Sequence, residues 1–127
     1  MGGRGGSGRS SAAVIQVPAG DANAMADLDI RDAYQNALDR AGRGSAPSGQ
    51  TGGPWLSMLD LRTALSTLGW DRGKQDRELM RFIRERKAFV SSESNRKIMT
   101  QRSIDAQLLR GGNTVDNFSL KDWRRPQ

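Results

Sequence analysis

Residues 55–90 decide the fold, and their sequence is WLSMLDLRTALSTLGWDRGKQDRELMRFIRERKAFV. Ser57 and Asp60 have the S-x-x-D spacing of a capping box, in which side chains bond the free backbone groups of the first turn, so a helix is expected to begin there. Gly69 can adopt the left-handed conformation that commonly ends a helix. Asp71 has the side chain of an N-cap, so another helix is expected to follow at once. The stretch therefore predicts two consecutive helices with a tight turn between them.

The second of these helices, residues 71 to about 87, has two chemically different faces. At 100° per residue, Leu79, Phe82 and Ile83 fall together on an apolar face. Within about 80° on the opposite side lie four cations: Lys74, Arg77, Arg81 and Arg84. These cations form either a solvated face that is stabilised by i,i+4 ion pairs to Glu78 and Glu85 or a ridge that contacts phosphates. We favour phosphate contact, because neither Arg77 nor Arg84 has an acidic residue four positions further along.

Upstream of this pair, residues 27–41 are expected to form the first helix. Apolar side chains recur there at helical spacing: Ile30, Tyr34, Ala37, Leu38 and Ala41. Glycines at positions 42 and 44 end this helix, residues 42–53 form a flexible connection, and a short extended run with Trp55 follows. The expected organisation is a disordered Gly/Ser/Arg tail over residues 1–26, one domain over residues 27–121 and a C-terminal tail over residues 122–127. Trp123 either frays with that tail or packs back on the domain.

Downstream, two strands are expected on either side of a longer connection. Residues 88–92 predict the first strand because Phe89 and Val90 are β formers, and residues 115–120 predict the second, with Phe118 and Leu120 on one face. Between the strands, Thr100 can cap a helix that extends through Arg110. That helix would turn Ile104, Leu108 and Leu109 inward and end at Gly111 and Gly112.

The composition excludes more chemistry than any motif supports. The chain has 127 residues with no His and no Cys, so zinc sites of Cys and His, Cys nucleophiles, His general bases and disulfides are excluded. Residues 69–75, GWDRGKQ, contain a GK pair, but the glycine spacing of a phosphate loop is wrong and Gln75 replaces the magnesium-binding Ser or Thr. We therefore expect neither an enzyme nor a cofactor. No apolar run approaches the roughly 18 residues of a membrane helix, and no secretory signal is evident, so a cytoplasmic protein is expected.

The net charge of +6 is concentrated in one part of the chain. Residues 70–110 hold eleven basic and six acidic side chains, whereas residues 1–69 hold six of each. Clustered cations suit a surface that replaces counterions on a polyanion. A solubilising basic surface is the alternative that the charge alone leaves open.

The predicted order of helix, short strand, helix, helix, strand, connection and strand resembles the winged helix-turn-helix domain, and the resemblance covers about residues 27–121. It implies an α+β fold: a three-helix core, a small sheet of two or three strands, and a wing enlarged by a helical insert. In that family the third helix typically lies in the DNA major groove and the wing contacts the backbone or minor groove. The resemblance implies that residues of the third helix contact the groove or the phosphates: Lys74, Gln75, Arg77, Arg81 and Arg84. It implies wing contacts for Arg96, Lys97 and Arg102. Gln75 is the main candidate for reading a base edge.

The function expected from these observations is non-catalytic binding of duplex DNA, by a small transcriptional regulator or DNA-binding accessory factor that would be associated with the nucleoid. The Gly-rich start, MGGRGGSG, is similar to the beginnings of small phage and mobile-element proteins. The alternative is a protein-interaction module, such as a mobile-element accessory or host-defence antagonist, that docks an acidic partner through residues 96–112.

Overall fold

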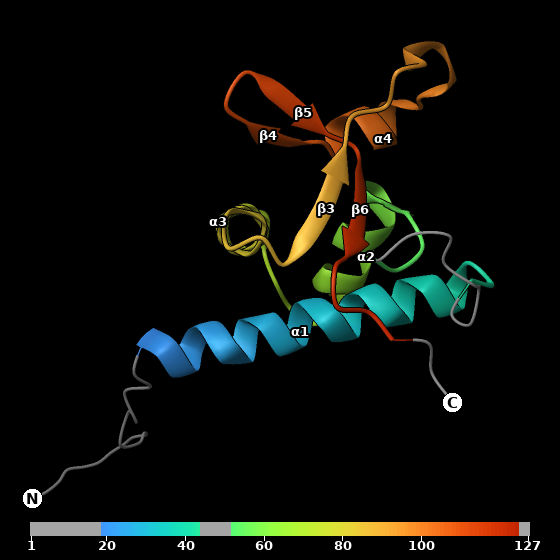
Figure 1. Ribbon diagram of the computed structural model, residues 1–127. Helices are drawn as coiled ribbons and strands as arrows, with labels where there is room; N and C mark the ends of the chain where they lie inside the picture. Colours follow the sequence, from blue (N-terminus) through green and yellow to red (C-terminus); the bar gives the residue numbers. More distant parts are fainter. Residues whose placement is uncertain (1–18, 44–51, 125–127) are drawn as a thin grey trace, which may run out of the picture.

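The computed structural model describes residues 19–43 and 52–124 and has an α+β architecture (Figure 1). The longest helix, α1, crosses one side of the molecule, and the other elements pack above it in the view of Figure 1. The helices are α1 (Ala19–Arg40), α2 (Met58–Thr67), α3 (Arg72–Arg84), the short 3-10 helix η2 (Arg96–Ile98) and α4 (Gln101–Asp105).

The strands form two small antiparallel sheets. In the first, β6 (Asn117–Leu120) lies between β2 (Leu56–Ser57) and β3 (Ala88–Ser91), so the strand order is β2-β6-β3. Phe118 of β6 is paired with Leu56 on one side and with Val90 on the other. The second sheet is a hairpin of β4 (Leu108–Arg110) and β5 (Asn113–Val115). The sheet thus joins segments that lie about 60 residues apart in the sequence.

The predicted helix boundaries around residues 57–71 are confirmed by their capping bonds. The Ser57 hydroxyl accepts a hydrogen bond from the Asp60 amide at 3.1 Å, and the Asp71 carboxylate accepts one from the Lys74 amide at 2.8 Å. Gly69 has φ +88°, the left-handed conformation expected of the residue that ends α2. Local side-chain chemistry therefore positions α3 directly after α2.

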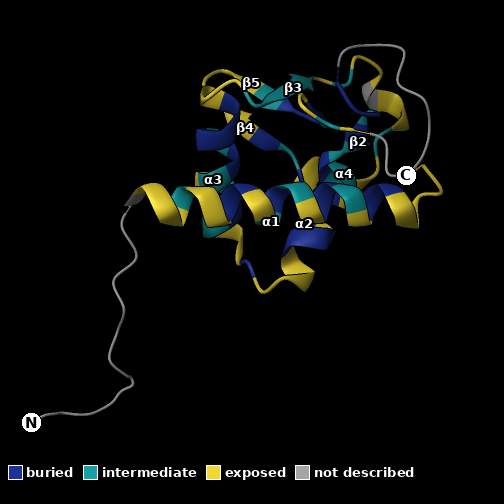
Figure 2. Ribbon diagram, turned by 60° about the horizontal axis from the view of Figure 1, so that its bottom comes forward, coloured by how far each residue is buried: buried dark blue, intermediate teal, exposed yellow. Residues whose placement is uncertain are grey.

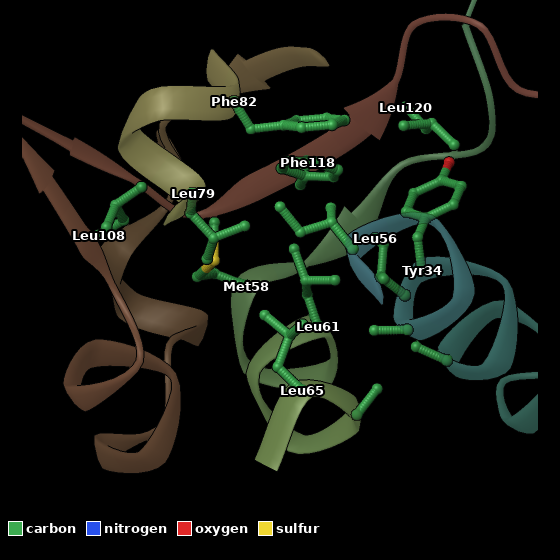
Figure 3. Close-up of a cluster of buried hydrophobic side chains, with 14 of the residues drawn as sticks. Tyr34, Leu56, Met58, Leu61, Leu65, Leu79, Phe82, Leu108, Phe118 and Leu120 are labelled. Atoms are coloured by element: carbon green, nitrogen blue, oxygen red, sulfur yellow. The ribbon is translucent and has the colours of Figure 1, made fainter. Parts of the chain in front are cut away.

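One apolar core joins the helices to β6 (Figure 3). The predicted inward face of α3 is confirmed: Leu79, Phe82 and Ile83 are all buried. The ring of Phe118 lies with its centroid 6.0 Å from that of Phe82 and 5.9 Å from that of Tyr34. Figure 2 shows buried residues along α1, α2 and α3, whereas α4 contains none. This core fixes which side of α3 is left for solvent.

The N-terminal boundary differs from the sequence prediction. Helix α1 begins at Ala19, eight residues before the expected start, so the expected tail over residues 1–26 is wrong for residues 19–26, and Ala26 belongs to the buried core. The remainder of that tail, residues 1–18, lies outside the described residues. At the other end Trp123 packs back on the domain, and its indole N–H donates to Gln35 at 2.8 Å.

The connection between β3 and β6 also differs. The helix expected from Thr100 to Arg110 is capped by Thr100 as predicted but ends at Asp105. Leu108, Leu109 and Arg110 instead form a strand that pairs with β5, with Leu108 buried and the other two residues exposed. Gly111 and Gly112 are the turn of the hairpin and do not end a helix. The described helices include none that is long and apolar enough to span a membrane.

Candidate nucleic-acid interface

The outward side of α3 carries two exposed arginines. Gly73, Arg77, Met80 and Arg84 follow one another at spacings of four, three and four residues, which places them on one stripe of the helix. Arg77 and Arg84 are exposed, and the described residues provide neither with an ion-pair partner. Met80 is half-buried against the core, and Gly73 adds no side chain. The exposed charge of this stripe is therefore wholly positive.

Gln75 does not lie on this stripe, and the interpretation that it reads a base edge is wrong for this structure. Only 3% of its surface is exposed. Its amide nitrogen donates to the Ser66 hydroxyl and to the Trp70 carbonyl, both at 3.0 Å, and its amide oxygen accepts from Arg62 at 3.1 Å. These bonds satisfy both ends of the amide, so Gln75 fastens the turn between α2 and α3 from inside.

Arg81 is also inside, contrary to its predicted place on the cationic ridge. Its guanidinium contacts Asp27 of α1 at 2.7 Å, and it also contacts two glutamates of α3 at 2.9 and 3.0 Å, which are Glu78 and Glu85. The helical wheel placed Arg81 correctly opposite Phe82 and Ile83 but could not show that α1 covers this side of the helix. Its charge is neutralised within the fold.

Asp27 is the acidic centre of this ion cluster, and Lys87 is its second cationic partner. Burial alone would raise the pKa of Asp27, but hydrogen bonds from Lys87 and Arg81 outweigh burial and hold that pKa below its ordinary value of 3.8. The hydrogen bonds that Lys87 donates to Asp27 and Glu85 raise the pKa of Lys87 above 10.5. Both shifts favour the charged forms in the folded chain.

The depressed pKa of Asp27 predicts acid sensitivity. Above pH 3.8 Asp27 is charged in both states and its contribution is complete; below pH 3.8 the unfolded chain takes up the proton first, so the contribution is lost as the pH falls through the folded pKa. In urea titrations from pH 7 to 2.5, the difference in unfolding free energy between wild type and Asp27→Asn is expected to shrink below pH 3.8. A difference that stays constant over this range would contradict a stabilising role for the carboxylate.

Lys74 lies in the first turn of α3. It is half-buried, and its ammonium lies 4.6 Å from the centroid of the Trp70 ring, a cation–π contact, rather than in the pair with Glu78 that the alternative of a solvated face implied. The Trp70 indole N–H in turn donates to Asp29 at 3.3 Å. Lys74 thus keeps its charge but is held against the start of α3.

The β4–β5 hairpin lies near α3, and a buried arginine fixes its base. Arg62 of α2 donates to the Ala106 carbonyl at 2.6 Å and to the Gln107 carbonyl at 3.3 Å, and it also contacts Asp76 of α3 at 2.8 Å. Burial lowers the pKa of Arg62 from its ordinary value. Sequence reasoning missed this residue. The available signal was a lone arginine beside the apolar stripe of α2, at the edge of the face that holds Leu61 and Leu65.

The three predicted wing residues belong to η2 and α4 and not to the hairpin. Lys97 and Arg102 are exposed, and the side chain of Arg96 lies outside the described residues. Arg102 lines an open groove of about 420 Å³ with residues of α2 and of the first turn of α3, including Ser66 and Arg72. This groove does not include Arg77 or Arg84. The structure therefore divides the predicted cations between two surfaces.

No family model, curated protein or solved structure matches this chain. The described residues contain no group of three or more Asp or Glu side chains placed to hold a metal ion. The chemistry of the surface must therefore be inferred from its own side chains.

Proposed function

We propose that this chain is a winged-helix protein that binds duplex DNA without catalysis, with the outward stripe of α3 in the major groove and the β4–β5 hairpin beside it. The observation that carries the proposal is the pair of exposed arginines, Arg77 and Arg84, without acidic partners among the described residues. The fold supports it, because the order α1, β2, α2, α3, β3, β6 and the strand order β2-β6-β3 suit a winged helix. Such binding would suit a small transcriptional regulator or a DNA-binding accessory factor.

The spacing of the two arginines suits contact with phosphates. Arg84 follows Arg77 by seven positions, which corresponds to about 10.5 Å along the helix axis. The major groove is roughly 12 Å wide and admits a helix, so two cations at this spacing can reach its phosphate edges. With Gln75 buried, the stripe has no amide for bidentate contact to adenine. Binding is therefore expected to depend on phosphates and to discriminate weakly between sequences.

Reversing both charges tests the proposal. The double variant Arg77→Glu, Arg84→Glu is expected to lose measurable binding to unrelated 20-bp duplexes in fluorescence anisotropy, because two phosphate contacts become repulsive. The wild type should show a linear fall of log K with log salt concentration, with a slope of about 0.9 per phosphate contacted. The melting temperature should change by no more than a few degrees, since both side chains are exposed.

The matched control makes the same charge change on the other surface. Lys97→Glu, Arg102→Glu alters η2 and α4 and is expected to weaken binding only modestly, through the long-range field. If the control abolishes binding and the α3 variant does not, η2 and α4 form the DNA-binding surface. If the wild type binds no duplex at 50 mM salt, the proposed function is wrong.

A second candidate function is docking of an acidic protein on η2 and α4. The observation that favours it is the exposure of two isoleucines, Ile98 and Ile104, in the segment that also carries Lys97 and Arg102. Such an interface would bury the isoleucines and depend less steeply on salt than phosphate contacts do. Weak DNA binding at 150 mM salt would favour this second function.

A further inference from the structure

The tip of the β4–β5 hairpin presents an exposed leucine. Alternation along β4 places Leu108 in the core, where Figure 3 shows it near Leu79 of α3, and turns Leu109 to the opposite face. Leu109 is 72% exposed, the most exposed of the large apolar side chains in the described part of the chain. Arg110, the next residue, is exposed, and no described acidic side chain pairs with it. The end of this hairpin therefore exposes one apolar and one cationic side chain, which are neighbours in the sequence.

The turn of the hairpin carries no side chains, because both of its residues are glycine. Gly111 has φ +61°, so the turn requires a residue that tolerates the left-handed region. Gly112 does not have a positive φ, and a Cβ added there would meet nothing within 4 Å. The fold therefore does not require glycine at position 112. A missing side chain where the fold has room for one suits close approach of the backbone to a ligand.

The base of the hairpin is anchored by buried side chains and hydrogen bonds. Leu108 and Val115 are buried, and Gln107 donates to Asp116 at 2.7 Å. Arg62 and Arg72 both donate to the Gln107 carbonyl, at 3.3 Å each. A tip held in this way cannot simply fold back when it meets resistance from a partner.

We propose that the segment from Leu109 to Asn113 is a wedge that enters the DNA minor groove, where Leu109 partly unstacks a base step and bends the duplex. This inference rests on the proposed function, and it adds that the bound duplex is bent. The roughly 4.8 Å between two paired strands is the distance between their axes, so the whole ribbon is wider than the roughly 6 Å minor groove and enters it only where the groove opens, as it does when the duplex bends toward the major groove. Minor-groove proteins that kink DNA combine an inserted apolar side chain with nearby arginines. Arg110, which is exposed beside Leu109 in the sequence, supplies that cation.

The test measures DNA bending separately from DNA binding. A 30-bp duplex with a donor and an acceptor dye at its ends is titrated with wild type, and its bend is expected to lie in the range of roughly 20–90°. Leu109→Ser is expected to reduce that bend by at least half and to weaken affinity about three- to tenfold. The salt slope should not change, because Leu109 contacts no phosphate. Gly112→Leu, which thickens the turn, should also reduce the bend.

Ile98→Ser is the matched control, because Ile98 is 68% exposed on η2, away from the hairpin tip. It should leave the bend unchanged. If wild type binds but does not bend the duplex, or if both Leu109→Ser and Gly112→Leu bend it fully, the wedge is wrong and the proposed function stands. If wild type binds no duplex at 50 mM salt, both are wrong. Circular dichroism melting of each variant verifies that the hairpin changes leave the core folded.

Discussion

Arg81→Ala is expected to lower the free energy of unfolding by about 3–5 kcal/mol, which is a large share of the 5–15 kcal/mol typical of a domain. The reason is the charge left behind: Asp27 exposes only 9% of its side chain and would keep Lys87 as its sole cationic partner among the described residues. Glu78 would also lose its ion pair. Urea unfolding at pH 7, followed by tryptophan fluorescence, measures the loss.

Arg77→Ala is the control for this prediction, because Arg77 lies one turn earlier on the same helix but is exposed. Its cost should stay within about 0.5 kcal/mol. Equal losses for the two variants would mean that Arg81 does not hold α3 to α1. A charge reversal at Arg81 would therefore report on folding rather than on DNA contact. Substitutions of Arg77 and Arg84 are the ones that test DNA contact.

The sequence was sufficient where structure depends on short-range rules. The caps at Ser57, Asp71 and Thr100 are recognisable because one side chain meets an amide three residues later, and the structure contains all three. The inward face of α3 was predictable for a similar reason, since Leu79, Phe82 and their apolar neighbours repeat at helical spacing. These rules were enough for the number and order of the three larger helices and for the strand at residues 88–91.

The sequence was insufficient where a partner comes from far along the chain. Arg81 finds Asp27 across 54 positions, and Arg62 finds Ala106 across 44. A helical wheel separates apolar from charged faces but does not show which charged face another helix covers. The hairpin was missed because Leu108 and Leu109 fit a helix as well as a strand until β5 is present to pair with them. Of the eight predicted site residues, Arg81 was misplaced for this reason, whereas Gln75 is buried by partners that lie closer in the sequence, Ser66, Trp70 and Arg62.

Phe82→Ala is expected to cost about 3–5 kcal/mol, enough to unfold much of a small domain. Phe82 is fully buried, and its ring stacks on Phe118 at the centre of the β2-β6-β3 sheet. The cations of Arg31 and Lys87 lie 5.5 and 5.9 Å from its centroid, so the same substitution removes two cation–π contacts. Thermal melting and urea unfolding should both show the loss.

Phe89→Ala is the control for this prediction, because it also removes a phenyl ring but from a position outside the buried core. Phe89 is half-buried on β3, where the Lys121 ammonium lies 5.6 Å from its centroid. Its truncation should cost only about 1 kcal/mol, because much less apolar surface leaves the interior. A Phe82→Ala protein that unfolds cooperatively with a loss no larger than that of Phe89→Ala would mean that α3 turns a different face to the core. Arg77 and Arg84 would then not face outward either, because the inward face of α3 and its outward face are fixed by the same rotation of the helix about its axis.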